Sequence, residues 1–339
     1  MARFEPLPTV RFSDGELRII DQTLLPGRYE ILSLKTLDAV CEAIRSLRVR
    51  GAPALGIAGA YGLLVALSES SGHNERDRLE HAAERIAATR PTAVNLAWAL
   101  NRMLKAASHA DDGVLGDLVR EAHLILAEDL AMSEAMTSHG ANLIADGDAV
   151  LTHCNTGGLC SGGGGTALGA VFAAAADGRR VQVFANETRP LLQGARLTAW
   201  ECAQRGVPVT VLVEGAAASL LSSRKVASVL VGADRIAANG DVANKVGTLG
   251  LAILARRAGV PFYVVAPSST IDVSLPDGAH IPIEHRPDDE VIRFGGIATA
   301  PSGVDAYNPA FDVTPADLVD AIVTERGVHR FPYQFTAAR

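Results

Sequence analysis

The sequence is poor in cysteine and in aromatic residues, and it contains no long apolar run. Its 339 residues include only 4 cysteines, without a CxxC pair, so neither a secreted disulfide scaffold nor a structural zinc site is expected. Reduced thiols in a cytoplasm are predicted instead. The longest apolar stretch, Ala54 to Leu67, is too short to cross a bilayer, and the start Met-Ala-Arg-Phe-Glu-Pro-Leu-Pro lacks the apolar core of a signal peptide. We therefore expect no membrane partner.

Blocks of basic residues are also missing. The formal net charge is -7, from 38 acidic against 31 basic residues that are spread along the chain. This predicts no basic face for nucleic acid, and a small molecule becomes the expected ligand. The 9 histidines show no HExxH or other metal-ligand spacing, so no metal site is predicted.

Two kinds of periodicity follow one another along the chain. Residues 9–33 alternate apolar and polar side chains, which predicts a hairpin and a third strand. Helical periodicity follows in the segments 34–47, 53–67, 75–89, 94–107 and 114–144, with breaks at Gly51, Ser71-Gly72, Arg90-Pro91 and Asp111 to Gly113. Short β-branched runs then alternate with Ala- and Leu-rich helices, at 149–153, 180–185, 208–213, 228–231 and 261–265.

This order of elements predicts an α/β chain in two parts. A small N-terminal sheet with a helical bundle is expected over residues 1–125. The alternating strands and helices predict a Rossmann-like domain with a parallel sheet over residues 126–339.

Cys154 is the first candidate functional residue. It ends the run Ala149 to His153 and opens the turn Cys-Asn-Thr-Gly-Gly-Leu-Cys-Ser-Gly-Gly-Gly-Gly-Thr. Open α/β sheets bind ligands outside the carboxyl ends of their strands, and the N–H groups at the start of a following helix favour a thiolate. The alternative is a buried cysteine that acts as a small hydrophobic residue. His153 is expected on the opposite side of the strand, in the core, and Cys160 is expected to be a packing residue.

Asp234 is the second candidate. It follows the buried apolar strand predicted at 228–231, at the end where ligands bind. A carboxylate there is either a cap for the next turn or a general acid or base whose pKa is raised by burial.

Cations and amides accompany these two groups near glycine turns. Arg50 precedes the Gly-Ala-Pro helix start at Gly51 and Ala52, where free N–H groups and a guanidinium can share an anion. Lys245 is predicted, with Asn244, to open a helix that begins Val-Gly-Thr-Leu-Gly.

Arg90 and Gln193 complete the set of candidates. Arg90 lies in a loop at the end of the helix predicted at 75–89, and Gln193 lies in a loop after the strand predicted at 180–185. For Arg50 and Arg90 the alternative is a solvated charge in a loop. Together, a thiol, a carboxylate, an amide and several cations without a metal cluster suit the movement of a proton or hydride within a phosphorylated metabolite.

The motifs that carry these residues resemble those of the methylthioribose-1-phosphate isomerases, a family related to the regulatory subunits of initiation factor 2B. The matching segments run almost end to end: Arg50 to Gly56 (RGAPALG), Thr89 to Leu96 (TRPTAVNL), Thr152 to Asn155 (THCN), Glu187 to Gly194 (ETRPLLQG), Gly232 to Asn239 (GADRIAAN), Asn244-Lys245 and Asn308 to Pro315 (NPAFDVTP).

The resemblance implies an isomerase that converts an aldose 1-phosphate to a ketose 1-phosphate, as a homodimer and without metal or organic cofactor. It implies that Cys154 and Asp234 are catalytic. It further implies that the sugar phosphate is held by a set of residues at the helix start and the strand ends: Arg50, Gly51, Ala52, Arg90, Gln193, Asn244 and Lys245.

One segment departs from the family pattern. The family usually has Leu-Ala-Thr and then Gly-Tyr-Gly-Thr after the cysteine, whereas this chain has Leu159-Cys160-Ser161 and Gly163 to Thr166. The missing Tyr is expected to leave space near C5 of the sugar, so 5-deoxyribose 1-phosphate is an alternative substrate.

Two other function classes remain as alternatives. A dinucleotide-dependent oxidoreductase fits the glycines only marginally, because no G-x-G-x-x-G is present apart from one spacing that ends at Ala167. A non-catalytic regulatory protein would share the fold, but it has no chemical need for both Cys154 and Asp234.

Overall fold

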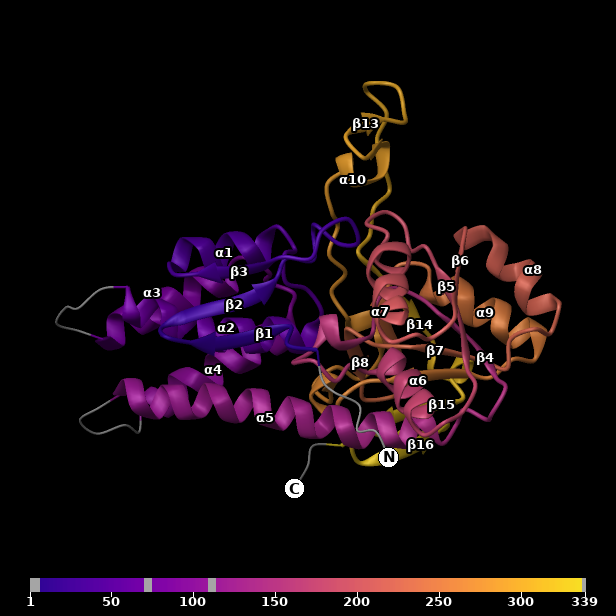
Figure 1. Cartoon of the computed structure of the whole chain (residues 1–339), viewed down its shortest axis with the longest axis horizontal. Helices are drawn as coiled ribbons and strands as arrows, with labels where there is room; N and C mark the ends of the chain where they lie inside the picture. The colour runs from indigo at the N-terminus through magenta and orange to yellow at the C-terminus, as the bar shows by residue number, and fades with distance from the viewer. Residues whose placement is uncertain (1–6, 70–74, 109–113, 337–339) are drawn as a thin grey trace.

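The computed structural model describes residues 7–69, 75–108 and 114–336. Its first elements are three antiparallel strands, β1 (Val10–Ser13), β2 (Glu16–Ile20) and β3 (Ile31–Leu34), in the order β1-β2-β3 (Figure 1). Asp14 and Gly15 both have a positive φ in the turn between β1 and β2, as a two-residue hairpin turn requires. The predicted hairpin and third strand are confirmed.

Five helices follow, as the periodicity predicted. They are α1 (Leu37–Arg45), α2 (Ala52–Ser68), α3 (Glu75–Ala87), α4 (Val94–Ser108) and α5 (Val114–Ala141). The apolar stretch noted in the sequence lies in α2, which is buried along nearly its whole length at the centre of the bundle. In the described part of the chain, no helix is long and apolar enough to span a membrane. The predicted breaks at Ser71-Gly72 and Asp111 to Gly113, and the start of the chain at residues 1–6, lie outside the described residues.

A seven-stranded sheet forms the other half of the molecule, with strand order β16-β15-β10-β7-β4-β5-β6. All five predicted strands are present and parallel: β4 (Ala149–Thr152), β5 (Gln182–Asn186), β6 (Val209–Leu212), β7 (Ser228–Val231) and β10 (Phe262–Val265). Two strands were missed, the parallel β15 (Ala321–Thr324) and the antiparallel edge strand β16 (Gly327–Arg330). The connecting helices are α6 (Ala167–Ala176), α7 (Ala199–Gln204), α8 (Ala217–Ser222) and α9 (Thr248–Ala258).

A small four-stranded sheet was not predicted. It has the order β11-β8-β9-β14 and consists of β11 (Ile271–Asp272), β8 (Arg235–Ala237), β9 (Val242–Lys245) and β14 (Phe311–Thr314). This corrects the predicted place of Asn244 and Lys245. They end strand β9, paired with β14 far along the chain, and helix α9 begins only at Thr248.

An arm projects from the body of the molecule between β11 and β14. It carries the short helix α10 (Asp289–Ile292) and the hairpin of β12 (Arg293–Phe294) and β13 (Ile297–Ala298). Figure 1 shows the arm standing away from both the N-terminal helices and the seven-stranded sheet.

Separate apolar cores support the two halves. One cluster of buried side chains runs from Val10 to Ile125, and two others on the seven-stranded sheet draw their members from Met136 onward. The long helix α5 contributes to the N-terminal core and to the cluster that begins at Met136. The predicted division between residues 125 and 126 falls within α5, and it stays a prediction.

Candidate active site

The strand order of the large sheet reverses between β4 and β7, and this is where the candidate residues meet. In open α/β sheets ligands bind at such a reversal, outside the carboxyl ends of the strands. Cys154 follows β4 and Asp234 follows β7. One cavity at this place is lined by all nine residues predicted for the site: Arg50, Gly51, Ala52, Arg90, Cys154, Gln193, Asp234, Asn244 and Lys245.

Cys154 has an unusual backbone conformation. Its φ of 64° lies in the left-handed region, which a side chain other than glycine rarely adopts without support. Two hydroxyls provide that support. The N–H of Cys154 donates to Oγ1 of Thr188 (2.8 Å), and its carbonyl accepts from Oγ1 of Thr198 (2.7 Å). These bonds orient the thiol at the edge of the cavity.

Two buried carboxyl groups hold the loop that follows. Glu201 accepts hydrogen bonds from Nδ2 of Asn155 (2.8 Å) and from the N–H of Gly158 (2.7 Å), and burial raises the pKa of Glu201. Asp129 of α5 accepts from the N–H of Gly162 (2.7 Å), and burial raises its pKa to about 6. The glycine-rich loop is thus tied to both α5 and α7.

The helix start expected beside Cys154 is farther along the chain and is already capped. Helix α6 begins at Ala167, after a loop that contains the 3₁₀ turn Gly158–Cys160. Thr156 accepts from the N–H of Leu168 (3.0 Å, through Oγ1) and from the N–H of Thr166 (2.8 Å, through its carbonyl). These two N–H groups are therefore not available to a thiolate, which corrects part of the reasoning from the sequence.

His153 lies in the core, as predicted. Its Nε2 faces the carbonyl of Val246 (2.9 Å), which only accepts, so Nε2 carries the proton and donates. Its Nδ1 then accepts from Nδ2 of Asn186 (3.2 Å). Burial lowers the pKa of His153 to about 4, in keeping with a neutral ring. His153 thus ties the end of β4 to the residue after Lys245 rather than acting as a base.

Asp234 lines the cavity with a carboxyl group whose pKa is raised. Its N–H donates to the carbonyl of Ala243 (2.9 Å), which sets the turn between β7 and β8. Burial raises the pKa of Asp234, and the nearby charges of Lys245 and Arg50 oppose this only in part. A carboxyl group with a raised pKa is suited to proton donation near neutral pH.

Lys245 is a buried basic residue that lines the cavity with Cys154 and Asp234. Burial lowers the pKa of Lys245, while Cys154 and Asp234 raise it in part. Its ammonium lies 5.2 Å from the ring centroid of Phe311, which is opposite Lys245 in the pairing of β9 with β14. Asn244 is buried next to it and donates from Nδ2 to Oγ1 of Thr248 (3.0 Å).

Two arginines of the cavity keep nitrogen atoms that no described residue pairs. Arg50 donates from Nη2 to the carbonyl of Asn155 (2.9 Å), but its buried Nη1 has no partner among the described residues, and the same holds for Nε of Arg90. Buried donors are nearly always paired, so these atoms fit an anionic ligand with several oxygens. The buried Oε1 of Gln193 is unpaired in the same sense.

Gly51 brings the start of α2 against the glycine-rich loop. It has a φ of 93°, and a Cβ placed on it would lie 2.4 Å from the carbonyl oxygen of Cys160. Cys160 itself is buried and directs its thiol to the carbonyl of Gly157 (3.1 Å), as a packing residue does. The close approach puts Arg50 and Ala52 at the cavity.

We expect Gly51→Ala to lower the free energy of unfolding by about 2–5 kcal/mol, because backbone strain and a clash with Cys160 add. Gly178→Ala is the matched control. Gly178 has a similar φ of 88°, but a Cβ there would meet nothing within 4 Å, so only the strain of about 1–2 kcal/mol is expected. Urea unfolding of both variants measures the difference, and equal losses would contradict the close approach.

Some site features were not predicted. Arg286 also lines the cavity, yet it follows a short extended segment, Ile281 to His285, that carries no local signal of a binding site. Arg189 of the ETRP motif, in contrast, is not among the cavity-lining residues. Its guanidinium donates to the carbonyl of Val291 in the arm (2.8 Å).

Gly164, which stands where the family has Tyr, does not provide the space that was expected near C5 of the sugar. A Cβ on Gly164 would lie 2.4 Å from Cβ of Ser133 in α5, and Gly164 is not among the residues that line the cavity. The lack of a side chain at Gly164 is explained by the close packing of α5.

A family model described as the Initiation factor 2 subunit family matches residues 48–330. The chain belongs to this family. This confirms the resemblance seen in the motifs, and the fold class agrees with that of the relatives of known structure.

Individual relatives within the family are close in sequence and length. The chain is 51% identical to 5-deoxyribose 1-phosphate isomerase of Moorella thermoacetica, with 99% of this chain and 98% of the relative covered. It is 52% identical to methylthioribose-1-phosphate isomerase of Pelotomaculum thermopropionicum, with 96% and 92% covered. These names agree with the expected enzyme class, a sugar-phosphate isomerase.

Solved structures give the same fold. The 5-methylthioribose 1-phosphate isomerase of Pyrococcus horikoshii superimposes with a TM-score of 0.90 at 42% identity, covering 98% of this chain and 96% of that one. A structure described as translation initiation factor eIF-2B, subunit delta, from A. fulgidus has a TM-score of 0.87 at 41% identity, covering 96% and 97%.

Proposed function

We propose that this chain converts 5-methylthioribose 1-phosphate, an aldose, to 5-methylthioribulose 1-phosphate, a ketose, in methionine salvage. The observation that carries the proposal is the cavity between β4 and β7. The thiol of Cys154, the carboxyl group of Asp234 and two arginines line it, and each arginine has a buried nitrogen without a hydrogen-bond partner among the described residues. Relatives named for this activity, about half identical over nearly the whole chain, support the choice of sugar.

Phosphate binding is the first task of the site. We assign it to the cations and amides of the cavity: Arg50, Arg90, Gln193, Asn244 and Lys245, with the backbone at Gly51 and Ala52. A guanidinium offers paired donors that match phosphate oxygens, and the ammonium of Lys245 adds a compact charge.

Ring opening is the second task. A sugar phosphorylated on its anomeric oxygen does not open by ordinary mutarotation, so the ring oxygen needs a proton as its bond to C1 breaks. Protonated Asp234 supplies that proton. Burial raises the pKa of Asp234, which favours its acid form relative to an exposed carboxyl group.

The isomerisation itself has two possible routes. In the first, the Cys154 thiolate removes the proton from C2 and an enediol that keeps the phosphate on O1 forms. The proton returns at C1 while O2 gives its proton to the carboxylate of Asp234, and the ketose results. In the second, hydrogen moves with its electron pair from C2 to C1 while Asp234 handles the O2 proton, and Cys154 acts only through its charge or bulk.

The reaction in heavy water distinguishes the two routes. Deuterium at C1 of the product is expected for the enediol route, because the proton on the thiol exchanges with solvent before it returns. Product free of deuterium at partial conversion would contradict that route and favour the hydride shift. Mass spectrometry and proton NMR of the isolated ketose measure the incorporation.

A second candidate substrate is 5-deoxyribose 1-phosphate, the substrate named for the Moorella relative. Purified protein is mixed in parallel with 5-methylthioribose 1-phosphate, 5-deoxyribose 1-phosphate and ribose 1,5-bisphosphate, and ketose formation is followed by NMR. We expect the highest kcat/KM for the methylthio sugar. Preference for another sugar would keep the chemistry and change the pathway. No turnover of any would overturn the proposal in favour of a non-catalytic regulatory protein.

The proposal includes a cytoplasmic homodimer that works without metal or organic cofactor. The four free cysteines are all buried, as suits a reducing compartment. Light scattering after size exclusion tests the dimer, and activity that survives a metal chelator tests the absence of a metal requirement.

A further inference from the structure

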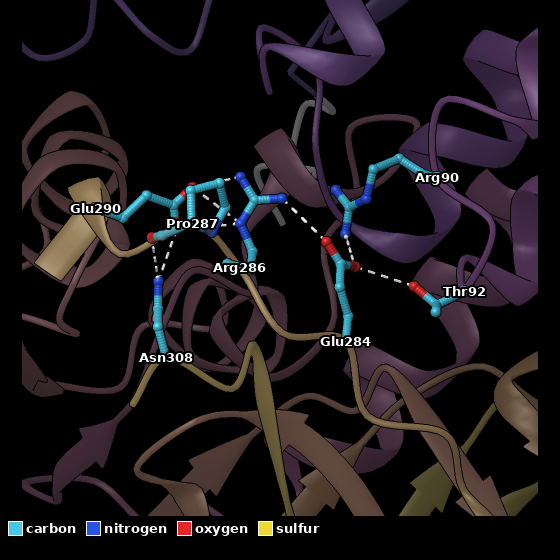
Figure 2. A network of polar contacts seen from close by, with 7 residues as sticks. All are labelled: Arg90, Thr92, Glu284, Arg286, Pro287, Glu290 and Asn308. Carbon is cyan, nitrogen blue, oxygen red and sulfur yellow. Dashed lines mark hydrogen bonds and ion pairs between the residues drawn. The ribbon is translucent and has the colours of Figure 1, made fainter. Parts of the chain in front are cut away.

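The carboxylate of Glu284 connects two segments that face each other across the cavity. Its Oε2 accepts from Nη2 of Arg90 (3.3 Å) and from Oγ1 of Thr92 (3.0 Å), and its Oε1 accepts from Nη1 of Arg286 (3.0 Å). Figure 2 shows Glu284 between Arg286 on one side and Arg90 and Thr92 on the other.

The two segments belong to different halves of the molecule. Arg90 and Thr92 lie in the loop between α3 and α4, whereas Glu284 lies in the extended segment before the arm. Arg90, Thr92 and Arg286 all line the cavity. Glu284 therefore connects the wall built by the helical bundle to the wall built by the sheets.

The connection is electrostatic and largely shielded from solvent. The exposed fractions of the side chains are 13% for Arg90, 20% for Glu284 and 17% for Arg286. Burial opposes ionisation of Glu284, but Arg90, Arg286 and Thr92 outweigh it and hold the pKa of Glu284 below its usual value. The charged form of Glu284 is thus maintained between the two guanidinium groups.

Further contacts hold the segment that carries Glu284. Arg286 pairs with Glu290 as well as with Glu284, and Nδ2 of Asn308 donates to the carbonyl of Pro287 (3.0 Å) (Figure 2). Arg286 thus pairs with two carboxylates, and Glu284 pairs with both Arg286 and Arg90. Arg90 has no other ion pair among the described residues.

Arg235 makes a second contact with the α3–α4 loop. Nη2 of Arg235 donates to the carbonyl of Thr92 (3.2 Å), and Arg235 also pairs with Asp272 (3.4 Å). The α3–α4 loop is thus held at the side chain of Arg90 and at both the hydroxyl and the carbonyl of Thr92.

We propose that Glu284 is a positioning residue. It holds the α3–α4 loop against the segment before α10 and so orients Arg90 toward the phosphate of the substrate. This rests on the proposed function, in which Arg90 binds that phosphate. Nη2 of Arg90 donates to Glu284, while its buried Nε has no partner in the part of the chain that the structure describes. Glu284 makes no hydrogen bond with Cys154 or Asp234, so its role concerns binding rather than the chemical step.

The first test is a split between KM and kcat. We expect Glu284→Gln to raise KM by about tenfold with kcat changed by less than about threefold, because the loss of one charge releases Arg90 and leaves the reactive groups in place. Thr92→Val is expected to shift KM in the same direction, and less than additively in combination with Glu284→Gln. Since Glu284 also contributes to the raised pKa of Asp234, each variant is assayed across pH and compared at its optimum.

The matched control is Asp289→Asn. Asp289 lies a little farther along the chain, in α10, and pairs with Arg293 at the surface. Asp289→Asn therefore removes the same charge as Glu284→Gln without touching the α3–α4 loop. Its KM is expected to equal that of the unaltered protein. A tenfold rise in KM for Asp289→Asn, or an unchanged KM for Glu284→Gln, would overturn the proposal.

The second test needs no substrate. In the free protein, amide hydrogen exchange of residues 89–93 is expected to accelerate in Glu284→Ala and to stay unchanged in Asp289→Asn. Calorimetric binding of inorganic phosphate should weaken in Glu284→Ala. These readouts decide the role of Glu284 even if no sugar phosphate is turned over, an outcome that would overturn only the proposed function. Unchanged exchange and unchanged phosphate binding would refute the positioning role.

Discussion

Replacing Cys154 with Ser is expected to lower kcat by about 10²–10⁴-fold, the range that a positioned acid or base contributes. A hydroxyl is far less acidic than a thiol, so serine cannot replace the thiolate that the proposed proton abstraction at C2 requires. The backbone of residue 154 is held by Thr188 and Thr198 through main-chain atoms, which the substitution leaves intact. The fold should therefore be preserved, as circular dichroism and thermal unfolding would report.

Cys160→Ala is the matched control for this experiment. Cys160 lies in the same loop, is buried, and uses its thiol only for a contact with the carbonyl of Gly157. Alanine is also the usual residue of the family at this position. We expect near-normal turnover for Cys160→Ala. Near-normal turnover for Cys154→Ser would show that the thiol of Cys154 takes no part in the reaction.

Asp234→Asn is expected to lower kcat by a similar factor, about 10²–10⁴-fold, because the amide cannot donate a proton to the ring oxygen. The pH profile adds a signed prediction. Burial raises the pKa of Asp234, and the proposed ring opening requires its protonated form. The contribution of Asp234 to activity is therefore full below its raised pKa and is lost as the pH increases through it.

The comparison of pH profiles separates Asp234 from other titrating groups. The residual activity of Asp234→Asn should lack the alkaline decrease in kcat/KM that belongs to Asp234. The same decrease in the variant would assign it to another group. A decrease on the acid side that disappears in Asp234→Asn would make Asp234 a base in the free enzyme, contrary to the proposed ring opening.

Local sequence patterns predicted the helices and the central strands because their signals are short in range. The apolar stretch of α2 and the β-branched runs of β4 and β7 are each recognisable within one element. Strand β9 was not recognisable in this way. Asn244 and Lys245 precede a glycine and a true helix, and only the pairing of β9 with β14 makes them part of a sheet.

The candidate site shows the same division. Cys154 and Asp234 could be found because each ends a buried strand, and parallel strands bring their carboxyl ends to one edge. The close packing of Gly164 against α5, in place of open space near the sugar, could not be predicted. It depends on Ser133, which lies far earlier in the chain. Glu284 was missed for a similar reason, since its partners Arg90 and Thr92 lie in the other half of the molecule. Arg286 was missed because its place at the cavity depends on the tertiary fold.

By itself, the sequence determined the class of fold, the family, and the nine residues that the structure brings to one cavity. Periodicity, glycine turns and strand ends indicated the class of fold, and the motifs that resemble a known family indicated the family and the site residues, because all of these are local properties of the chain. The tertiary structure alone decided the neutral state of His153, the capping of α6 by Thr156, and the connection of the two halves through Glu284. Burial and hydrogen bonding between distant segments set these features, and neither is encoded in the spacing of neighbouring residues.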